Sequence, residues 1–174
     1  MKWFFWVLVG FVLVSCGSTR EVTEVQLASL EKAVTTPQFH IQAEWALPLD
    51  NDATQVLNLL QPAGNIVNAN RVFIDNGSHY IKVFTDSIAI HLPYYGTRQI
   101  SGGLPGNTNI EVAQKLSQWT EESSKKSHIR NLQFEAKQKG EAYDIRIRLH
   151  AKGSATVVVN SSQRQSIRYT GKWE

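Results

Sequence analysis

The clearest pattern in the chain is a strict alternation of apolar and polar residues over its last third. Short polar turns separate four alternating segments, which are 132–137, 143–150, 155–159 and 167–173. Alternation with a period of two places apolar side chains on one face of a strand and polar side chains on the other. The four segments therefore predict an antiparallel meander with one buried face, on which Tyr169 and Trp173 point inward.

The same period of two recurs earlier in the chain, in shorter stretches. Residues 39–47 alternate, which predicts a half-buried strand with Trp45 and Leu47 among its inward residues. Residues 80–84 and 88–92 predict a pair of strands joined at 85–87.

Three further segments are less regular. Residues 65–74 predict a weak strand that ends before the hairpin turn at Asn76-Gly77. Residues 110–126 fit either a helix or two short strands, and we favour strands. Residues 55–64 leave helix and strand open.

One helix is predicted before the first strand. In residues 21–34, Leu27, Leu30 and Val34 share a face, with glutamates near the start and Lys32 near the end. Pro37 ends the segment. We expect this helix to cover the apolar face of the sheet, which gives a single α+β domain over residues 21–174.

The first residues predict a targeting signal. Lys2 precedes an apolar run over 3–14, a length typical of a signal peptide and too short to cross a bilayer. We therefore assign residues 1–15 to a signal peptide. The hydrophobic share of 42% and the charged share of 19% are typical of a globular domain.

Cys16 is the only cysteine, and it directly follows the apolar run. The stretch Leu13-Val14-Ser15-Cys16 resembles the lipobox of bacterial lipoproteins, which implies cleavage before Cys16 and acylation of its sulfur. Residues 16–20 would then be a lipidated tether. Several acyl chains together anchor a protein stably in a membrane. The alternative is an ordinary secretory cleavage with an incidental thiol. We expect a membrane-anchored lipoprotein of the cell envelope, on the periplasmic or outer-membrane face.

Signatures of catalysis are missing from the sequence. The five histidines are scattered, and none are spaced as metal ligands on one helical face. No G-x-S-x-G elbow occurs, and the Gly-rich stretch 101–106 lacks the ending of a phosphate-binding loop. We therefore predict no enzyme activity, no catalytic residue, no metal and no cofactor. The formal charge of +3 argues against a dedicated nucleic-acid binder.

An aromatic turn is the first candidate for binding. Tyr94 and Tyr95, with Arg98 close by, precede the Gly-rich stretch 101–106. Tyrosine rings offer rigid contact area with a polar tip. The alternative, which the pattern favours, is that one ring closes the core and the other faces solvent. We take Tyr95 as the exposed ring.

The outward face of the meander is the second candidate. Its basic residues are Lys137, Arg146, Arg148, Arg168 and Lys172. Such a face would suit anionic headgroups, a glycan or an acidic protein partner. The alternative is a solvated face whose cations pair with Glu135 and Asp144 across strands. Alternation alone favours this second interpretation.

Two stretches carry a family resemblance: "LPYYG" at 92–96 and "GSATVVVNSSQRQSIRYTG" at 153–171. They resemble the bacterial lipoproteins grouped as domain of unknown function 4251. The match runs from about residue 39 to the end of the sequence, and the insertion around 50–70 departs from it. The resemblance implies an antiparallel sheet with helical cover, similar to folds grouped with the β-lactamase-inhibitor protein. The family has no established activity, so it implies no catalytic residues.

These observations together predict a non-catalytic envelope lipoprotein. We expect it to be held at the membrane by its lipid and to bind or scaffold an envelope protein or a glycan. The alternative is an envelope hydrolase or sugar-processing enzyme whose active site no motif reveals. A polar pocket with perturbed ionisable groups would favour the enzyme.

Overall fold

The computed structural model describes residues 21–49, 67–68, 71–74, 76–95, 109–116, 119–123, 128–138 and 140–174, with backbone alone at 67–68 and 122–123. The predicted signal peptide, Cys16 and its tether, residues 55–64, Arg98 and the Gly-rich stretch 101–106 lie outside the described residues. Among the described helices, none has the length and apolar character needed to cross a membrane.

The predicted N-terminal helix is present as α2, Glu24–Thr35. It begins with a capping box, in which the backbone N–H of Gln26 donates to the Thr23 hydroxyl and the Thr23 N–H donates to the Gln26 side chain. Leu30 and Val34 lie buried on its inner face. Local sequence thus sets both the start of the helix and the face that packs.

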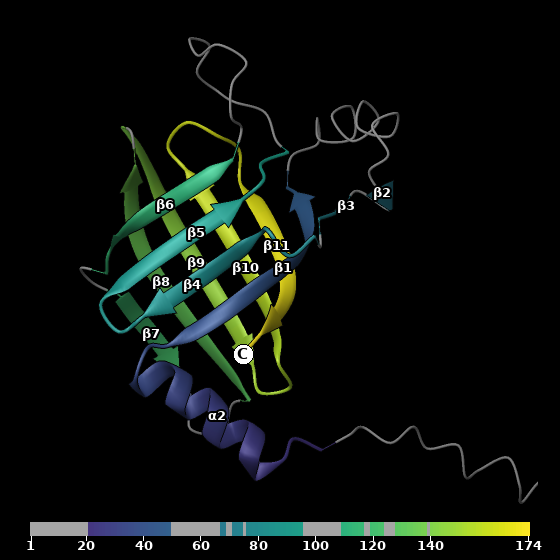
Figure 1. The fold of residues 1–174 in the computed structure, drawn as a ribbon, viewed down its shortest axis with the longest axis vertical. Coiled ribbons are helices and arrows are strands. Elements are labelled where there is room, and N and C mark those ends of the chain that lie inside the picture. Colours follow the sequence, from purple (N-terminus) through teal and green to yellow (C-terminus); the bar gives the residue numbers. More distant parts are fainter. Residues whose placement is uncertain are drawn as a thin grey trace, which may run out of the picture.

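Eleven strands make up the rest of the described fold (Figure 1). They are β1 Phe39–Pro48, β2 Val67–Asn68, β3 Arg71–Phe73, β4 Tyr80–Phe84, β5 Ser87–Leu92, β6 Ile110–Lys115, β7 Trp119–Ser123, β8 Ile129–Gln138, β9 Glu141–His150, β10 Ser154–Ser161 and β11 Ile167–Trp173. The order in the sheet is β6-β5-β4-β1-β11-β10-β9-β8-β7, and each neighbouring pair is antiparallel. The short β3 pairs with β1 and β2. The α+β class and the C-terminal meander are confirmed, and 110–126 forms two strands in its described part.

The sheet curls until β6 approaches β8 (Figure 1). One side chain joins the two strands: the Gln114 amide donates to the Glu135 carbonyl over 3.2 Å and accepts from the Lys137 N–H over 3.0 Å. The apolar face of β8–β11 is thereby covered mainly by β1 and β4–β6, and α2 covers one end. We expected the helix to cover this face, and in the structure it covers only one end of it. A helix of 12 residues is only about 18 Å long.

The core follows the predicted alternation in β8–β11, where Tyr169 is 1% exposed. Trp173 is only partly buried, because it is the last residue of β11, where its indole N–H donates to the His150 carbonyl over 2.7 Å. In β1 the prediction was wrong for Trp45 and Leu47, which are not among the buried residues, whereas Ala46 is 0% exposed.

A register shift between Ala43 and Trp45 explains the inversion in β1. The extra residue, Glu44, turns every later side chain of the strand to the opposite face. Gly171 lies opposite the shift, and a Cβ there would lie 1.9 Å from the Gln42 carbonyl oxygen. Only glycine allows the two backbones to approach so closely.

Candidate functional site

A groove of about 600 Å³ lies on the outward face of β7–β11 and β1. We call it the arginine groove, because three of its described lining residues are the predicted Arg146, Arg148 and Arg168. Its other described lining residues are Leu47, Thr120, Asn131, Leu132, Gln133, Ile147, Thr156, Val158 and Thr170.

Two rows of outward side chains, set by the strand register, build the groove. The first row is Thr120, Gln133, Arg146, Val158, Arg168 and Leu47, one residue from each of β7, β8, β9, β10, β11 and β1. The second row is Asn131, Arg148, Thr156 and Thr170, from β8 to β11. Residues that face each other in a row have their Cβ atoms roughly 5 Å apart. Distant parts of the sequence thus form one continuous surface.

The hollow follows from the lengths of the side chains on neighbouring strands. The central strand β10 contributes the short Thr156 and Val158. Arginines stand on both sides of β10, Arg146 and Arg148 on β9 and Arg168 on β11. Long side chains on either side of short ones leave a trough whose floor is uncharged and whose edges carry guanidinium groups.

Each guanidinium keeps donors available for a ligand. Arg148 donates from Nε to the Asn131 side chain over 3.0 Å, which leaves its terminal nitrogens for other partners. Arg146 Nη2 lies 3.0 Å from Asp144, which also accepts from Gln133 and Asn160. Arg168 makes no side-chain hydrogen bond or ion pair within the part of the chain that the structure describes.

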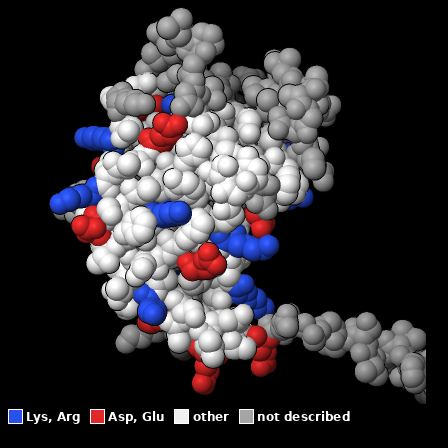
Figure 2. All heavy atoms as spheres, viewed as in Figure 1, with Lys and Arg blue, Asp and Glu red and all other residues white. Residues whose placement is uncertain are grey.

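The electrostatics of the arginine groove favour anions. Its described lining holds three arginines and no Asp or Glu, and the carboxylate of Asp144 lies beside Arg146. The other two predicted basic residues lie elsewhere: Lys172 pairs with Glu44 over 3.0 Å, and Lys137 lies in a separate small pocket with Asp144. On the opposite side of the molecule, basic and acidic side chains are interspersed over a largely uncharged surface (Figure 2).

The aromatic turn is divided between core and surface. Tyr94 is 4% exposed, and its hydroxyl donates to the Gln165 carbonyl over 3.0 Å. Tyr95 is only partly buried, and burial raises the pKa of its hydroxyl. Tyr94 is therefore a structural residue, and Tyr95 is the more exposed of the two rings.

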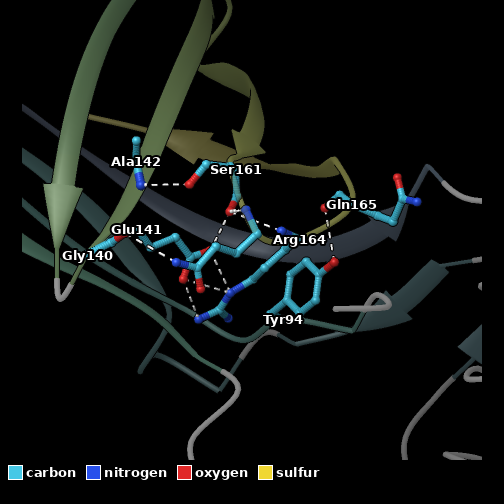
Figure 3. A network of polar contacts seen from close by, with 9 residues as sticks. Tyr94, Gly140, Glu141, Ala142, Ser161, Arg164 and Gln165 are labelled. Atoms are coloured by element: carbon cyan, nitrogen blue, oxygen red, sulfur yellow. Dashed lines mark hydrogen bonds and ion pairs between the residues drawn. The ribbon is translucent and has the colours of Figure 1, made fainter. Parts of the chain in front are cut away.

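Sequence reasoning missed a buried polar network next to Tyr94 (Figure 3). Arg164, in the turn between β10 and β11, binds both carboxylate oxygens of Glu141 at 2.9–3.2 Å, and each side chain is 6% exposed. The Ser161 hydroxyl also donates to Glu141. Burial on its own would raise the pKa of Glu141, but hydrogen bonds from Ser161 and Arg164 outweigh burial and lower it. The one signal in the sequence that could have indicated this network was the specific hairpin sequence around Arg164.

Comparisons with known proteins identify the family of this chain. The family model described as "Domain of unknown function (DUF4251)" matches residues 21–173. The chain belongs to the DUF4251 family. A crystal structure of a DUF4251 family protein from Bacteroides eggerthii DSM 20697 has the same fold, with a TM-score of 0.56 and 15% sequence identity over 86% of this chain and 87% of that chain. No curated protein matches. Membership of DUF4251 confirms the resemblance seen in the sequence and brings no activity with it.

The described residues of this DUF4251 protein show no metal centre. No three His, Cys, Asp or Glu side chains among them are grouped in a way that could hold an ion. The polar groups of the described lining of the arginine groove are guanidinium groups, hydroxyls and carboxamides.

Proposed function

We propose that this DUF4251 protein is a lipid-anchored envelope protein that binds an anionic partner non-catalytically in the arginine groove. The observation that carries the proposal is the convergence of Arg146, Arg148 and Arg168 on one groove. Guanidinium groups bind carboxylate and phosphate in a planar, bidentate geometry and stay charged at all physiological pH values. The strands hold these groups on a rigid sheet, which lowers the entropy lost on binding.

The composition of the groove supports binding rather than catalysis. Its described lining contains no Asp, Glu, His, Cys or Lys. General acid–base chemistry needs a group whose pKa lies near the working pH, and arginine, threonine and the carboxamides do not supply one. The described groups with a shifted pKa, which include Glu141 and His79, lie outside this lining.

The expected lipid anchor would hold the domain near the membrane surface. Cys16 precedes the start of α2 at Glu24 by eight residues. A fully extended chain of this length reaches at most about 28 Å. A lipid on Cys16 would therefore keep the sheet within one domain's width of the bilayer, where envelope polymers and membrane proteins are both accessible.

Binding measurements on charge variants test the proposal. Wild-type protein and the triple variant Arg146→Ala, Arg148→Ala, Arg168→Ala are titrated by calorimetry with anionic and neutral oligomers at two salt concentrations. We expect wild type to bind anionic oligomers with an affinity that falls as salt rises, and the triple variant to lose most of that affinity.

The matched control is the double variant Lys137→Ala, Lys172→Ala, which removes basic residues of the same sheet face that lie outside the arginine groove. It should bind like wild type. Equal losses in the control and in the triple variant would show that only net charge matters, and the proposal would then be wrong.

A further inference from the structure

We infer that the anionic partner is an extended acidic glycan that carries a carboxylate on every second sugar, with its chain running across β9, β10 and β11. This inference rests on the proposed function and names the ligand class of the arginine groove. Three properties of the groove carry it: its length, the spacing of its charges and the polar groups between them.

The arginine groove is long in the direction that crosses the strands. Its first row runs from Thr120 on β7 to Leu47 on β1, one residue from each of six strands. At about 4.8 Å per strand, the row follows the sheet for roughly 24 Å. Only two rows, two residues apart along each strand, set its width. A site of this shape suits a chain-like ligand of several units.

The charges along the first row are separated by an uncharged position. Arg146 and Arg168 face Val158 from opposite sides, so their Cα atoms are about 9.6 Å apart, two strand spacings. In a glycan with one carboxylate on every second sugar, one neutral sugar lies between two charged sugars. This neutral sugar would lie over β10. A polymer with an anion on every unit, such as polyphosphate, would place an unpaired negative charge over Val158.

Uncharged polar side chains lie beside the arginines. Thr156 on β10 and Thr170 on β11 belong to the second row, and Gln133 on β8 faces Arg146 from the other side. Hydroxyl and carboxamide groups both donate and accept hydrogen bonds, as sugar hydroxyls do. The outward apolar residues of the lining are few, chiefly Val158 and Leu47, which offers little to an acyl chain. These polar side chains suit the hydroxyl groups of a sugar chain whose anionic groups bind the arginines.

Arg148 supplies an additional contact in the second row. It faces Thr156 from the β9 side, and its hydrogen bond to Asn131 fixes its direction. It lies two residues from Arg146 on one strand, about 6.8 Å away. Arg146 and Arg148 therefore serve one end of the bound segment, and Arg168 serves the other end alone.

This asymmetry gives a sharp test with oligosaccharides of defined length. The probes are unsulfated chondroitin disaccharide and tetrasaccharide, which carry one and two carboxylates on alternate sugars. Comparison probes are tetragalacturonate, polyphosphate, neutral maltotetraose and vesicles of phosphatidylglycerol. The full acylated chain in detergent micelles is titrated with the soluble probes, and the chain in neutral liposomes is mixed with the vesicles.

We expect the tetrasaccharide to bind roughly tenfold more tightly than the disaccharide, the effect of one further charge-assisted pair. In Arg168→Ala this ratio should fall close to one, because the second carboxylate loses its partner. In Arg148→Ala both affinities should fall while the ratio stays. Maltotetraose should not bind.

The outcomes separate this inference from the proposed function. If no anionic probe binds, both are wrong. If polyphosphate, tetragalacturonate or the vesicles bind at least as tightly as the chondroitin tetrasaccharide, the groove binds anions but the glycan inference is overturned. It is also overturned if wild type binds the two chondroitin probes equally, or if Arg168→Ala keeps the ratio.

Discussion

Arg164 binds Glu141 through two of its nitrogen atoms in a buried ion pair, which connects the β10–β11 turn to the first residue of β9. The pair lies beneath Tyr94, whose ring centroid is 5.2 Å from the guanidinium carbon. Tyr169 contributes a second tie nearby, since its hydroxyl donates to the Pro93 carbonyl over 2.7 Å. Together these contacts fix the ends of the strands that carry the arginine groove.

The buried pair should matter for stability mainly when it is broken. Arg164→Met leaves the Glu141 carboxylate buried without its cation, and we expect the free energy of unfolding to fall by about 3–5 kcal/mol. Urea denaturation followed by tryptophan fluorescence measures this. The double variant Glu141→Gln, Arg164→Met is the control, and it should recover part of the loss. An Arg164→Met variant as stable as wild type would contradict the prediction.

The lowered pKa of Glu141 predicts an acid-sensitive component of stability. Because the folded state holds the ionised carboxylate more strongly than the unfolded state, the unfolded chain binds the proton first as pH falls. The stabilisation is present above the ordinary glutamate pKa and is lost as pH falls towards the lower folded-state value. Denaturation across this range should show a smaller pH dependence for Glu141→Gln than for wild type. Equal slopes would contradict the prediction.

The two tyrosines of the turn should behave differently. Tyr94→Ala removes a buried ring and its hydrogen bond to Gln165, so we expect a loss of about 3–5 kcal/mol in unfolding free energy. Tyr95→Ala removes a partly buried ring and should cost clearly less. Melting temperatures measured by calorimetry compare the stabilities of the two variants. If Tyr95→Ala instead abolished ligand binding without lowering stability, the aromatic turn rather than the arginine groove would be the binding site.

The lipid anchor is tested at Cys16. Replacing the only cysteine by alanine removes the expected acylation site, and we expect the protein to leave the membrane fraction or to remain unprocessed. Metabolic labelling with a fatty-acid analogue and fractionation of cells measure both effects. Ser15→Ala is a neighbouring control that should still be labelled. A correctly cleaved Cys16→Ala protein that stays in the membrane fraction would contradict the anchor.

Periodicity predicted the parts of the fold in which one face is buried without interruption. The strands β8–β11 alternate cleanly, so their inward residues could be assigned before the structure. β1 could not, because its inverted half reads Trp45, Ala46 and Leu47, which are apolar in either phase. The sequence of such an apolar run does not reveal a register shift. Because Trp45 and Leu47 are larger than Ala46, we assigned them to the buried face, which was wrong.

The candidate site was predictable in its members but not in its shape. Alternation placed Arg146, Arg148 and Arg168 on one face. The groove depends on Val158 lying opposite two of them, and this register follows from strand pairing that the alternation does not determine. Arg164 was missed for a different reason. It lies in a polar turn, where no period marks a residue as buried.

The contact between β6 and β8 differs from the other strand contacts of the sheet, and we call it the seam. Along most of the sheet, neighbouring strands share a ladder of backbone hydrogen bonds, whereas within the described residues the Gln114 side chain makes two hydrogen bonds from β6 to the backbone of β8. The free energy of local opening is lowest where few hydrogen bonds must break at once. The seam is thus the natural place for solvent to reach the interior. The central groove strands β10 and β11 are separated from the seam by at least one fully laddered strand on either side, so the molecule can loosen there while its arginines keep their spacing.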